Sequence, residues 1–325
     1  MIVSASYRTD IPTFYGRWFA RRLQAGFCRV SNPYGCAPSI VRLDRDPVDG
    51  FVFWTRNLGP FRPVLETVAA RDTPFIVQYT ITGYSQALEA AMTAPETAIG
   101  QLRNLARDFG PARAVWRYGP VIDTALTPLP WHEENFARLA GALAGTVDEV
   151  VVSFTHIYKK TKANTDAAAR RHGFSWRDPP EDEKRATIAG LARIARIARI
   201  AARHGMALSA CAQPQLLAHL PTGLPSDSVG AARCVDAARL SAIGARPIAA
   251  REKGNRPGCA CAESRDIGAY DSCPHGCVYC YAVRHRGRVR EAHKAHDPAG
   301  EFLLQSDNLR WSGTAPPSDP FGTAG

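Results

Sequence analysis

The sequence predicts an α/β fold built on a parallel sheet, either an open doubly wound sheet or a barrel-like arc. Six short runs are rich in Val, Ile and aromatic residues and are bounded by turn residues, as is typical of strands covered on both faces. Helical segments separate these runs and one more follows the last of them, so strand and helix alternate along the chain.

In chain order, the predicted strands are residues 2–6, 50–55, 75–81, 113–118, 149–154 and 206–212. Runs such as GFVFWT and EVVVSF are short and rich in β-branched and aromatic residues, which favours strands over helices. The predicted helices are residues 13–26, 60–72, 94–110, 130–145, 181–204 and 227–244. Several of them carry Pro or acidic residues in the first turn and Gly just past the end, which are the usual helix boundaries.

The composition indicates a globular protein. The chain has 325 residues, of which 45% are hydrophobic and 22% charged. No apolar run approaches the ~20 residues that a membrane-spanning helix needs, and the first residues lack the pattern of a secretory signal. We therefore expect a cytoplasmic location and no membrane partner.

The composition of the sequence changes after Gly244. Hydrophobic periodicity ends there, and cysteines, turn residues and charged residues become frequent. This predicts a (βα)6 core at residues 1–244, a cysteine-rich module packed on it at 245–310, and a flexible tail at 311–325.

The net charge of +10 favours a polyanionic partner such as nucleic acid, although an Ala/Arg-rich composition can produce the same excess. Arg193, Arg196 and Arg199 recur every third residue of one predicted helix. We expect them to form a solvated face, with a nucleic-acid groove as the alternative.

Polar residues stand where the predicted strands end, and in parallel α/β folds this edge carries the site. They are Ser4, Ser6, Arg8, Asp10, Thr55, Arg56, Asn57, Thr80, Thr82, Arg117, Tyr118, Ser153, Thr155, His156, Cys211 and Gln213. Each alone is typical of a cap or turn, but their recurrence predicts a pocket with a polar floor.

Nine cysteines, seven of them from Cys211 onward, indicate thiolate ligands more than disulfides in a reducing compartment. Cys273, Cys277 and Cys280 form a CxxxCxxC loop. Four thiolates normally complete an iron–sulfur cluster, so three from one loop leave one iron open to another ligand. A zinc site that pairs residues 277–280 with residues 259–261 is the alternative, and it leaves Cys273 unused.

The stretch CPHGCVYCYA resembles the cluster motif of the radical S-adenosylmethionine superfamily, and within it the branch of spore photoproduct lyase and DNA-repair photolyase-like proteins. In that superfamily the motif follows the first strand, whereas here it follows six predicted βα units. The rest of the chain is similar to an uncharacterised bacterial family, known as a domain of unknown function, in which the late position is the rule. The matching segments are SYRTDIPTFYGRWF, VDGFVFWTRN, YTITGY, VWRYGPV, SFTHIYKKTKAN, CACAESRDIGAYDSCPHGCVYCYA and HDP.

The resemblance implies a partial TIM-like barrel of about six βα units. It also implies that Cys273, Cys277 and Cys280 hold a [4Fe-4S] cluster whose fourth iron binds S-adenosylmethionine, with Tyr279 near the adenine. No glycine-rich methionine-binding stretch of the superfamily is visible. On chemical grounds we expect the remaining cofactor contacts from Asn57, Thr80, Arg117 and Ser153, because a carboxylate and a ribose need cations, amides and hydroxyls.

Four further cysteines, Cys211, Cys234, Cys259 and Cys261, match in number a second, fully ligated cluster. The alternative is that they are buried free thiols, which pack as small hydrophobic groups. Cys28 and Cys36 match nothing in the family pattern.

Three neighbouring polar features have simpler interpretations. His275, inside the loop, is expected to hydrogen-bond cluster sulfurs and not to ligate iron. Lys159, Lys160 and Lys162 are expected to be a solvated charge run, with a phosphate-binding lip as the alternative. The HDP segment at 296–298 is expected near the site.

Three functions remain open at this point. The first is a radical S-adenosylmethionine-type enzyme that forms a 5′-deoxyadenosyl radical, with a reductant such as ferredoxin or flavodoxin as partner and nucleic acid as a candidate substrate by analogy. The second is a non-catalytic, metal-organised nucleic-acid-binding protein. The third is an iron–sulfur protein of electron transfer or redox sensing.

Overall fold

The computed structural model describes residues 1–31, 37–201, 206–218 and 229–304. The predicted tail at 311–325, Cys36 and the side chain of Arg199 lie outside the described residues. No helix in the described part of the chain is long and apolar enough to cross a membrane.

All six predicted strands are present. They are β1 (Ile2–Ala5), β4 (Gly50–Thr55), β5 (Phe75–Thr80), β6 (Ala114–Val121), β8 (Glu149–Phe154) and β10 (Ala207–Ala210). Two further strands of the same sheet were not predicted, β11 (Val229–Ala231) and β12 (Ser264–Asp266). Together they form an eight-stranded sheet in the order β11-β10-β8-β6-β5-β4-β1-β12, in which every neighbouring pair is parallel. The prediction of an α/β fold with a parallel sheet is therefore confirmed.

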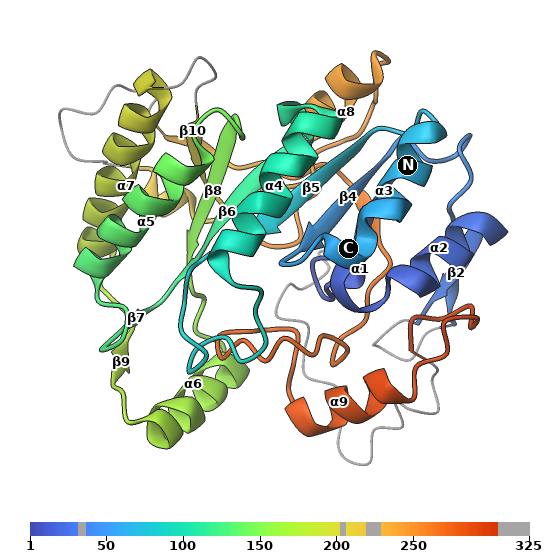
Figure 1. The fold of residues 1–325 in the computed structure, drawn as a ribbon. Coiled ribbons are helices and arrows are strands. Elements are labelled where there is room, and N and C mark those ends of the chain that lie inside the picture. The colour runs from blue at the N-terminus through green and yellow to red at the C-terminus, as the bar shows by residue number, and fades with distance from the viewer. Residues whose placement is uncertain (32–36, 202–205, 219–228, 305–325) are drawn as a thin grey trace.

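The helices alternate with these strands. They are α1 (Ile11–Phe14), α2 (Gly16–Ala25), α3 (Arg62–Ala70), α4 (Pro95–Phe109), α5 (Leu129–Leu143), α6 (Lys159–His172), α7 (Glu181–Ala201), α8 (Ala237–Gly244) and α9 (Arg286–Lys294). Single 3-10 turns occur at Gly59–Phe61, Pro111–Arg113 and Pro214–Leu216. Figure 1 shows α3, α4 and α5 along one face of the sheet, and α6 and α9 beyond the edge where the strands end.

The two faces of the sheet are covered differently. One face, with Phe51 and Phe53, packs against the helices in the large core. The other face, with Val52, Ile76 and Val115, packs against Leu240 and the cysteines of the segment that follows β11. This is the burial on both faces that continuous apolar strands require.

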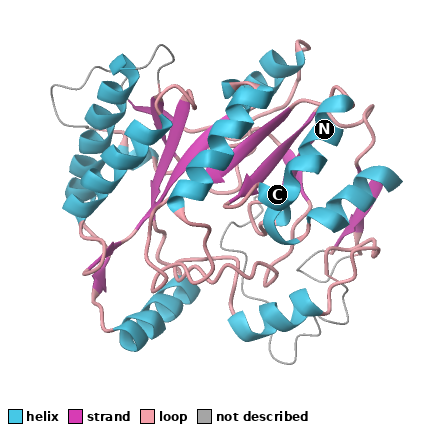
Figure 2. Cartoon of the chain, viewed as in Figure 1, coloured by secondary structure: helices cyan, strands magenta, loops and turns pink. Residues whose placement is uncertain are grey.

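Several elements differ from the predictions, chiefly where a polar segment has too weak an apolar pattern to indicate a helix or strand. The predicted helix at 227–244 is a helix only from Ala237, and β11 lies in the earlier part of that range. Helices α6 and α9 were not predicted, since their sequences are charged and their apolar stripes are narrow. Two small antiparallel pairs lie outside the main sheet, β2 (Phe27–Val30) with β3 (Ser39–Arg42), and β7 (Asp123–Thr124) with β9 (Trp176–Arg177). Figure 2 shows both pairs at the margins of the molecule.

The cysteine-rich segment contributes to the main sheet. Strand β12 pairs with β1, with Ile2 opposite Ser264 and Ser4 opposite Asp266. Residues near the end of the chain thus lie beside its first strand. This pairing explains how a late cysteine loop reaches the edge where the strands end.

The arginine-rich helix behaves as predicted where its side chains are described. Arg193 and Arg196 are exposed, while Leu191 and Ala195 are buried. The expectation of a solvated arginine face is confirmed for these two residues.

A fully buried histidine in α5 makes the fold sensitive to acid. Nε2 of His132 lies 3.1 Å from the carbonyl oxygen of Ile122, and Nδ1 lies 3.0 Å from the hydroxyl of Tyr118. Because a carbonyl only accepts, the neutral ring carries its proton on Nε2 and accepts from Tyr118 at Nδ1. Burial lowers the pKa of His132 to about 4.

We expect the free energy of unfolding to fall as the pH drops from 6.5 toward 4, because the unfolded chain takes up a proton that folded His132 does not. The loss from this residue is about 2 kcal/mol at pH 5 relative to pH 7.5. His132→Gln keeps a donor and an acceptor but does not titrate, so it is expected to flatten this dependence, whatever its stability at pH 7.5. Urea unfolding at a series of pH values measures both slopes. Equal slopes for the two proteins would contradict the assignment.

Candidate functional site

A cavity of about 280 Å³ opens at the edge where the strands of the main sheet end. Most of the polar residues predicted at the strand ends line it: Ser6, Arg8, Asp10, Thr55, Arg56, Thr80, Arg117, Ser153, Thr155, His156 and Cys211. Seven cysteines line the same cavity: Cys211, Cys234, Cys259, Cys261, Cys273, Cys277 and Cys280. The predicted pocket with a polar floor is therefore confirmed, and two groups of thiols share it.

The cysteine loop is fixed by the segments that follow β1 and β5. The hydroxyl of Tyr15 donates to the carbonyl oxygen of Ser272 at 2.6 Å, just before Cys273. The amide of Val278 donates to the carbonyl oxygen of Leu88 at 3.0 Å. Gly276 has a φ of +72°, and a Cβ there would meet that of Ala90 at 3.1 Å, so the turn between the first two cysteines depends on glycine.

His275 is held by protein oxygens on both sides. Nδ1 lies 2.8 Å from the carbonyl oxygen of Ala91, and Nε2 lies 2.7 Å from Oδ2 of Asp10. Both ring nitrogens therefore bond oxygens, and the expectation that the side chain hydrogen-bonds cluster sulfurs is wrong. The backbone N–H of His275 donates to Cys273 instead.

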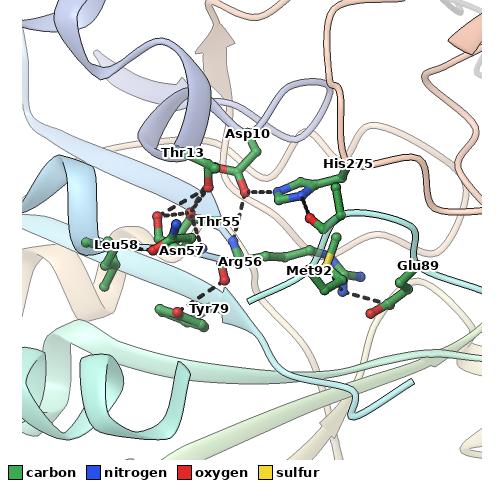
Figure 3. Close-up of polar contacts among 12 residues, drawn as sticks. Asp10, Thr13, Thr55, Arg56, Asn57, Leu58, Tyr79, Glu89, Met92 and His275 are labelled. Carbon is green, nitrogen blue, oxygen red and sulfur yellow. Dashed lines mark hydrogen bonds and ion pairs between the residues drawn. The ribbon is translucent and has the colours of Figure 1, made fainter. Parts of the chain in front are cut away.

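Asp10 follows β1 and connects the cysteine loop to the end of β4, as Figure 3 shows. Its oxygens accept from the hydroxyl of Thr55 at 2.8 Å and from the amide of Arg56 at 2.8 Å, in addition to His275. Burial would raise the pKa of Asp10, but the hydrogen bonds from His275, Thr13 and Arg56 lower it. Asp10 is thus an ionised anchor under the loop.

A second buried group lies under the other end of the loop. Arg56 donates to Oε1 of Glu89 at 2.7 Å and to the hydroxyl of Tyr279 at 2.7 Å, and Tyr279 also hydrogen-bonds Glu89. Burial alone would lower the pKa of Arg56, but the charge of Glu89 and the hydrogen bond to it raise that pKa well above its ordinary value. The side chain of Glu89 is 2% exposed. Figure 3 shows Arg56 reaching between Asp10 and Glu89.

The surroundings of the three loop thiols favour their neutral form. Desolvation raises the pKa of Cys273 well above its ordinary value, and Asp10 and the other two thiols add to this. Desolvation also raises the pKa of Cys280, and it raises that of Cys277 to about 12 in spite of Arg56. The three thiols are unpaired. Binding to a metal would replace their protons, which is how thiol ligation ordinarily proceeds.

The donor set fits a cluster better than a single ion. Among the described residues, no group of three or more His, Cys, Asp or Glu side chains is gathered so that it could hold one metal ion. A [4Fe-4S] cluster binds each cysteine through a different iron, so its ligands stand farther apart than the four ligands of zinc. Three free thiols of one loop line one cavity, where they could supply three ligands to a cluster.

The other four cysteines come together from three segments. Cys211 follows β10, Cys234 lies between β11 and α8, and Cys259 and Cys261 precede β12. Sγ of Cys234 lies 3.5 Å from Sγ of Cys211, and Cys261 interacts electrostatically with both Cys234 and Cys259. The hydrogen bond from Cys261 lowers the pKa of Cys259 to about 7.

The predicted cofactor contacts divide into two groups. Thr80, Arg117, Ser153 and Tyr279 line the cavity. Asn57 does not line it, because its Oδ1 accepts from the amide of Gly59 at 3.0 Å and from Gln101 at 2.9 Å, where it shapes the turn after β4 (Figure 3).

Sequence reasoning missed Glu89, the buried partner of Arg56, and two further residues, Asp266 and Arg256. Asp266, the last residue of β12, accepts from Ser4, Ser6 and Arg8 and so joins the cysteine-rich segment to β1. Its only signal in the sequence is its place within a segment that matches the family pattern. Arg256 lines the cavity in a stretch without periodicity, where the sequence gives no comparable signal.

The remaining predicted features lie around this site. Lys160 is half-buried, with Nζ 5.4 Å from the ring of Tyr270, while Lys159 and Lys162 are exposed at the start of α6. The HDP segment does not line the cavity. Its His296 packs on the ring of Tyr15, which in turn bonds the residue before Cys273. Cys28 is buried in the core at β2, away from both groups of thiols.

The chain matches the protein family described as "Domain of unknown function (DUF1848)" over residues 2–282, and it therefore belongs to that family. The comparisons find no matching curated protein and no matching solved structure.

Proposed function

We propose that this member of the DUF1848 family is a radical S-adenosylmethionine-type enzyme in which Cys273, Cys277 and Cys280 hold a [4Fe-4S] cluster. The observation that carries the proposal is the position of the three thiols. They belong to one CxxxCxxC loop, they are unpaired, and they line a cavity at the carboxyl ends of parallel strands, where α/β enzymes hold their sites.

The chemistry follows from three ligands. Three thiolates leave one iron of the cube free to bind the amino and carboxylate groups of S-adenosylmethionine. When bound, such a cluster would supply one electron for the reductive cleavage of S-adenosylmethionine into methionine and a 5′-deoxyadenosyl radical, which would take a hydrogen atom from the substrate. The electron has to come from a one-electron donor, and a ferredoxin or flavodoxin is the expected partner.

The residues of the chain would position these groups. Asp10 and His275 hold the first half of the loop, and Arg56 with Glu89 holds the second half through Tyr279. Thr80 and Ser153 offer hydroxyls to a ribose or carboxylate in the cavity. Trp54 and Tyr7 also line the cavity and offer apolar surface to an adenine ring.

The fold supports a partial TIM-like barrel. Helices cover one face of the eight-stranded sheet, and the segment after β11 fills the other face as the interior of an open barrel is filled. The site then lies at the mouth of the barrel, on the side where such enzymes carry their chemistry.

Anaerobic reconstitution tests the proposal. The wild-type chain is expected to bind iron and sulfide and to show, after reduction, an EPR signal that changes when S-adenosylmethionine is added. It is also expected to release 5′-deoxyadenosine slowly without substrate. Cys277→Ala is expected to abolish both effects, and Cys28→Ala, which removes a buried thiol far from the cavity, is the matched control.

Two results would contradict the proposal. A colourless protein that holds only zinc would favour a structural, metal-organised module. A reduced cluster that ignores S-adenosylmethionine and yields no 5′-deoxyadenosine would favour electron transfer or redox sensing.

A further inference from the structure

We infer that Cys211, Cys234, Cys259 and Cys261 bind a second iron–sulfur cluster, fully ligated by protein and facing the same cavity as the cysteine loop. This inference goes beyond the proposed function and stands without it. It rests on the arrangement of the four sulfurs, on two arginines that approach them, and on the loop that carries two of them.

The four sulfurs form a connected row. Sγ of Cys234 lies 3.5 Å from Sγ of Cys211, and Cys261 lies close enough to Cys234 and to Cys259 to interact with both electrostatically. A [2Fe-2S] cluster takes two cysteines on each iron, and the 3.5 Å between Sγ of Cys211 and Sγ of Cys234 suits two ligands that share one iron. A row divides into pairs that can bind different irons, as the ligands of a cluster do.

Two guanidinium groups approach this row. Arg117 donates to Sγ of Cys234 at 2.8 Å, and Arg256 donates to Sγ of Cys211 at 3.6 Å. No salt bridge to a carboxylate joins either arginine within the described parts of the chain. A neutral thiol is a weak acceptor and balances no charge, so two partly buried cations point to an anion at this place.

A cluster supplies that anion. Four thiolates around an iron–sulfur core with two positive charges carry a net charge of about −2, which matches the two arginines. The alternative of four buried thiols that pack as small hydrophobic groups accounts for the burial of Cys234 and Cys261, but not for the two cations.

The two sides of the loop that carries Cys259 and Cys261 lie close to each other. Residue Glu252 pairs with Ala262, and Glu263 bonds both Arg251 and Lys253 across the base of the loop. A Cβ on Gly254 would lie 2.1 Å from the carbonyl oxygen of Cys259, so only glycine fits there. The amide of Val235 donates to Sγ of Cys261 at 3.4 Å, the kind of N–H···S bond that tunes cluster sulfurs.

The decisive experiment separates the two sites by mutation in the full-length chain. In the variant C273A/C277A/C280A, anaerobic reconstitution with iron and sulfide is expected to leave a coloured protein with two or about four irons per chain. Its reduced EPR signal should not change with S-adenosylmethionine, because a fully ligated cluster has no open iron. In the complementary variant C259A/C261A, the iron content should be lower than in wild type by the amount of iron that C273A/C277A/C280A retains.

Controls keep the result independent of folding and of the proposed function. Cys28→Ala is expected to retain the wild-type iron content, and circular dichroism has to show that each variant is folded. Arg117→Met is expected to shift the reduction potential of the remaining cluster in C273A/C277A/C280A to a lower value, since a nearby positive charge is lost; Arg117→Lys should restore most of the shift.

Three outcomes would overturn the inference. One is a folded C273A/C277A/C280A protein that binds no iron. Another is zinc in place of iron at the four cysteines. The third is a Cys211–Cys234 disulfide, found by mass spectrometry after reconstitution, together with unchanged iron content in C259A/C261A. A lack of response to S-adenosylmethionine in the wild-type protein would count against the proposed function alone.

Discussion

Replacing Arg56 with Met is expected to lower the free energy of unfolding of the metal-free protein by about 3–5 kcal/mol. The change leaves Glu89, 2% exposed, as a buried carboxylate without its cation. Its remaining partners are the hydroxyls of Thr82 and Tyr279, which do not balance a full charge. Urea unfolding under reducing, iron-free conditions measures the loss.

The effect should reach the cysteine loop as well. Glu89 pairs with Cys277 in a short β-bridge, and Leu88 accepts from the amide of Val278, so a displaced Glu89 moves the loop. Less iron per chain is therefore expected after reconstitution. This second measurement distinguishes a local effect on the loop from a general loss of stability.

Two control variants define the cause. Adding Glu89→Gln to Arg56→Met removes the stranded charge and is expected to recover a large part of the loss. Arg62→Met removes an exposed cation that pairs with Glu66 and Asp108, and it should cost far less stability than Arg56→Met, because water screens an exposed pair. If Arg56→Met cost no more than Arg62→Met, the buried pair would not have the importance assigned to it.

Asp266→Asn is expected to cost a similar 3–5 kcal/mol, because it removes the charge that pairs with Arg8 and turns an acceptor into a donor. The carboxylate accepts from Ser4 at 2.9 Å, from Ser6 at 2.8 Å and from Arg8 at 2.9 Å. An amide retains only one of the two accepting oxygens. Its NH₂ group would face donors.

This substitution should also loosen the attachment of the cysteine-rich segment. Strand β12 and the loop after it are joined to β1 through Asp266, so faster hydrogen exchange and easier proteolysis are expected from residue 264 onward. Glu263→Gln is the matched control, since Glu263 is 41% exposed and pairs only with Arg251 and Lys253 on the surface. Equal losses of stability for Asp266→Asn and Glu263→Gln would show that Asp266 does not attach the cysteine-rich segment to β1.

Much of the fold could be read from the sequence. The six apolar runs became six parallel strands because both faces of a parallel sheet are covered, which leaves a continuous apolar signal. Strands β11 and β12 gave no such signal, since each has three residues and lies at an edge of the sheet. Helix α6 escaped because a charged helix with few buried residues has little periodicity to detect.

The candidate site was predictable in its residue types more than in its contacts. Cys273, Cys277 and Cys280 lie close together in the sequence, so their spacing as a ligand loop could be recognised from the sequence alone. The role of His275 could not be predicted, because both of its ring nitrogens bond oxygens from segments that lie more than 180 residues away in the chain.

The sequence by itself determined the α/β class, the polar ends of the strands and the cysteine spacing, because each depends on neighbours along the chain. Only the tertiary structure decided that β12 lies beside β1, that two groups of cysteines share one cavity, and that Arg117 and Arg256 approach the second group. These are contacts between segments distant in sequence, and they follow from the order of strands in the sheet, which no local pattern encodes.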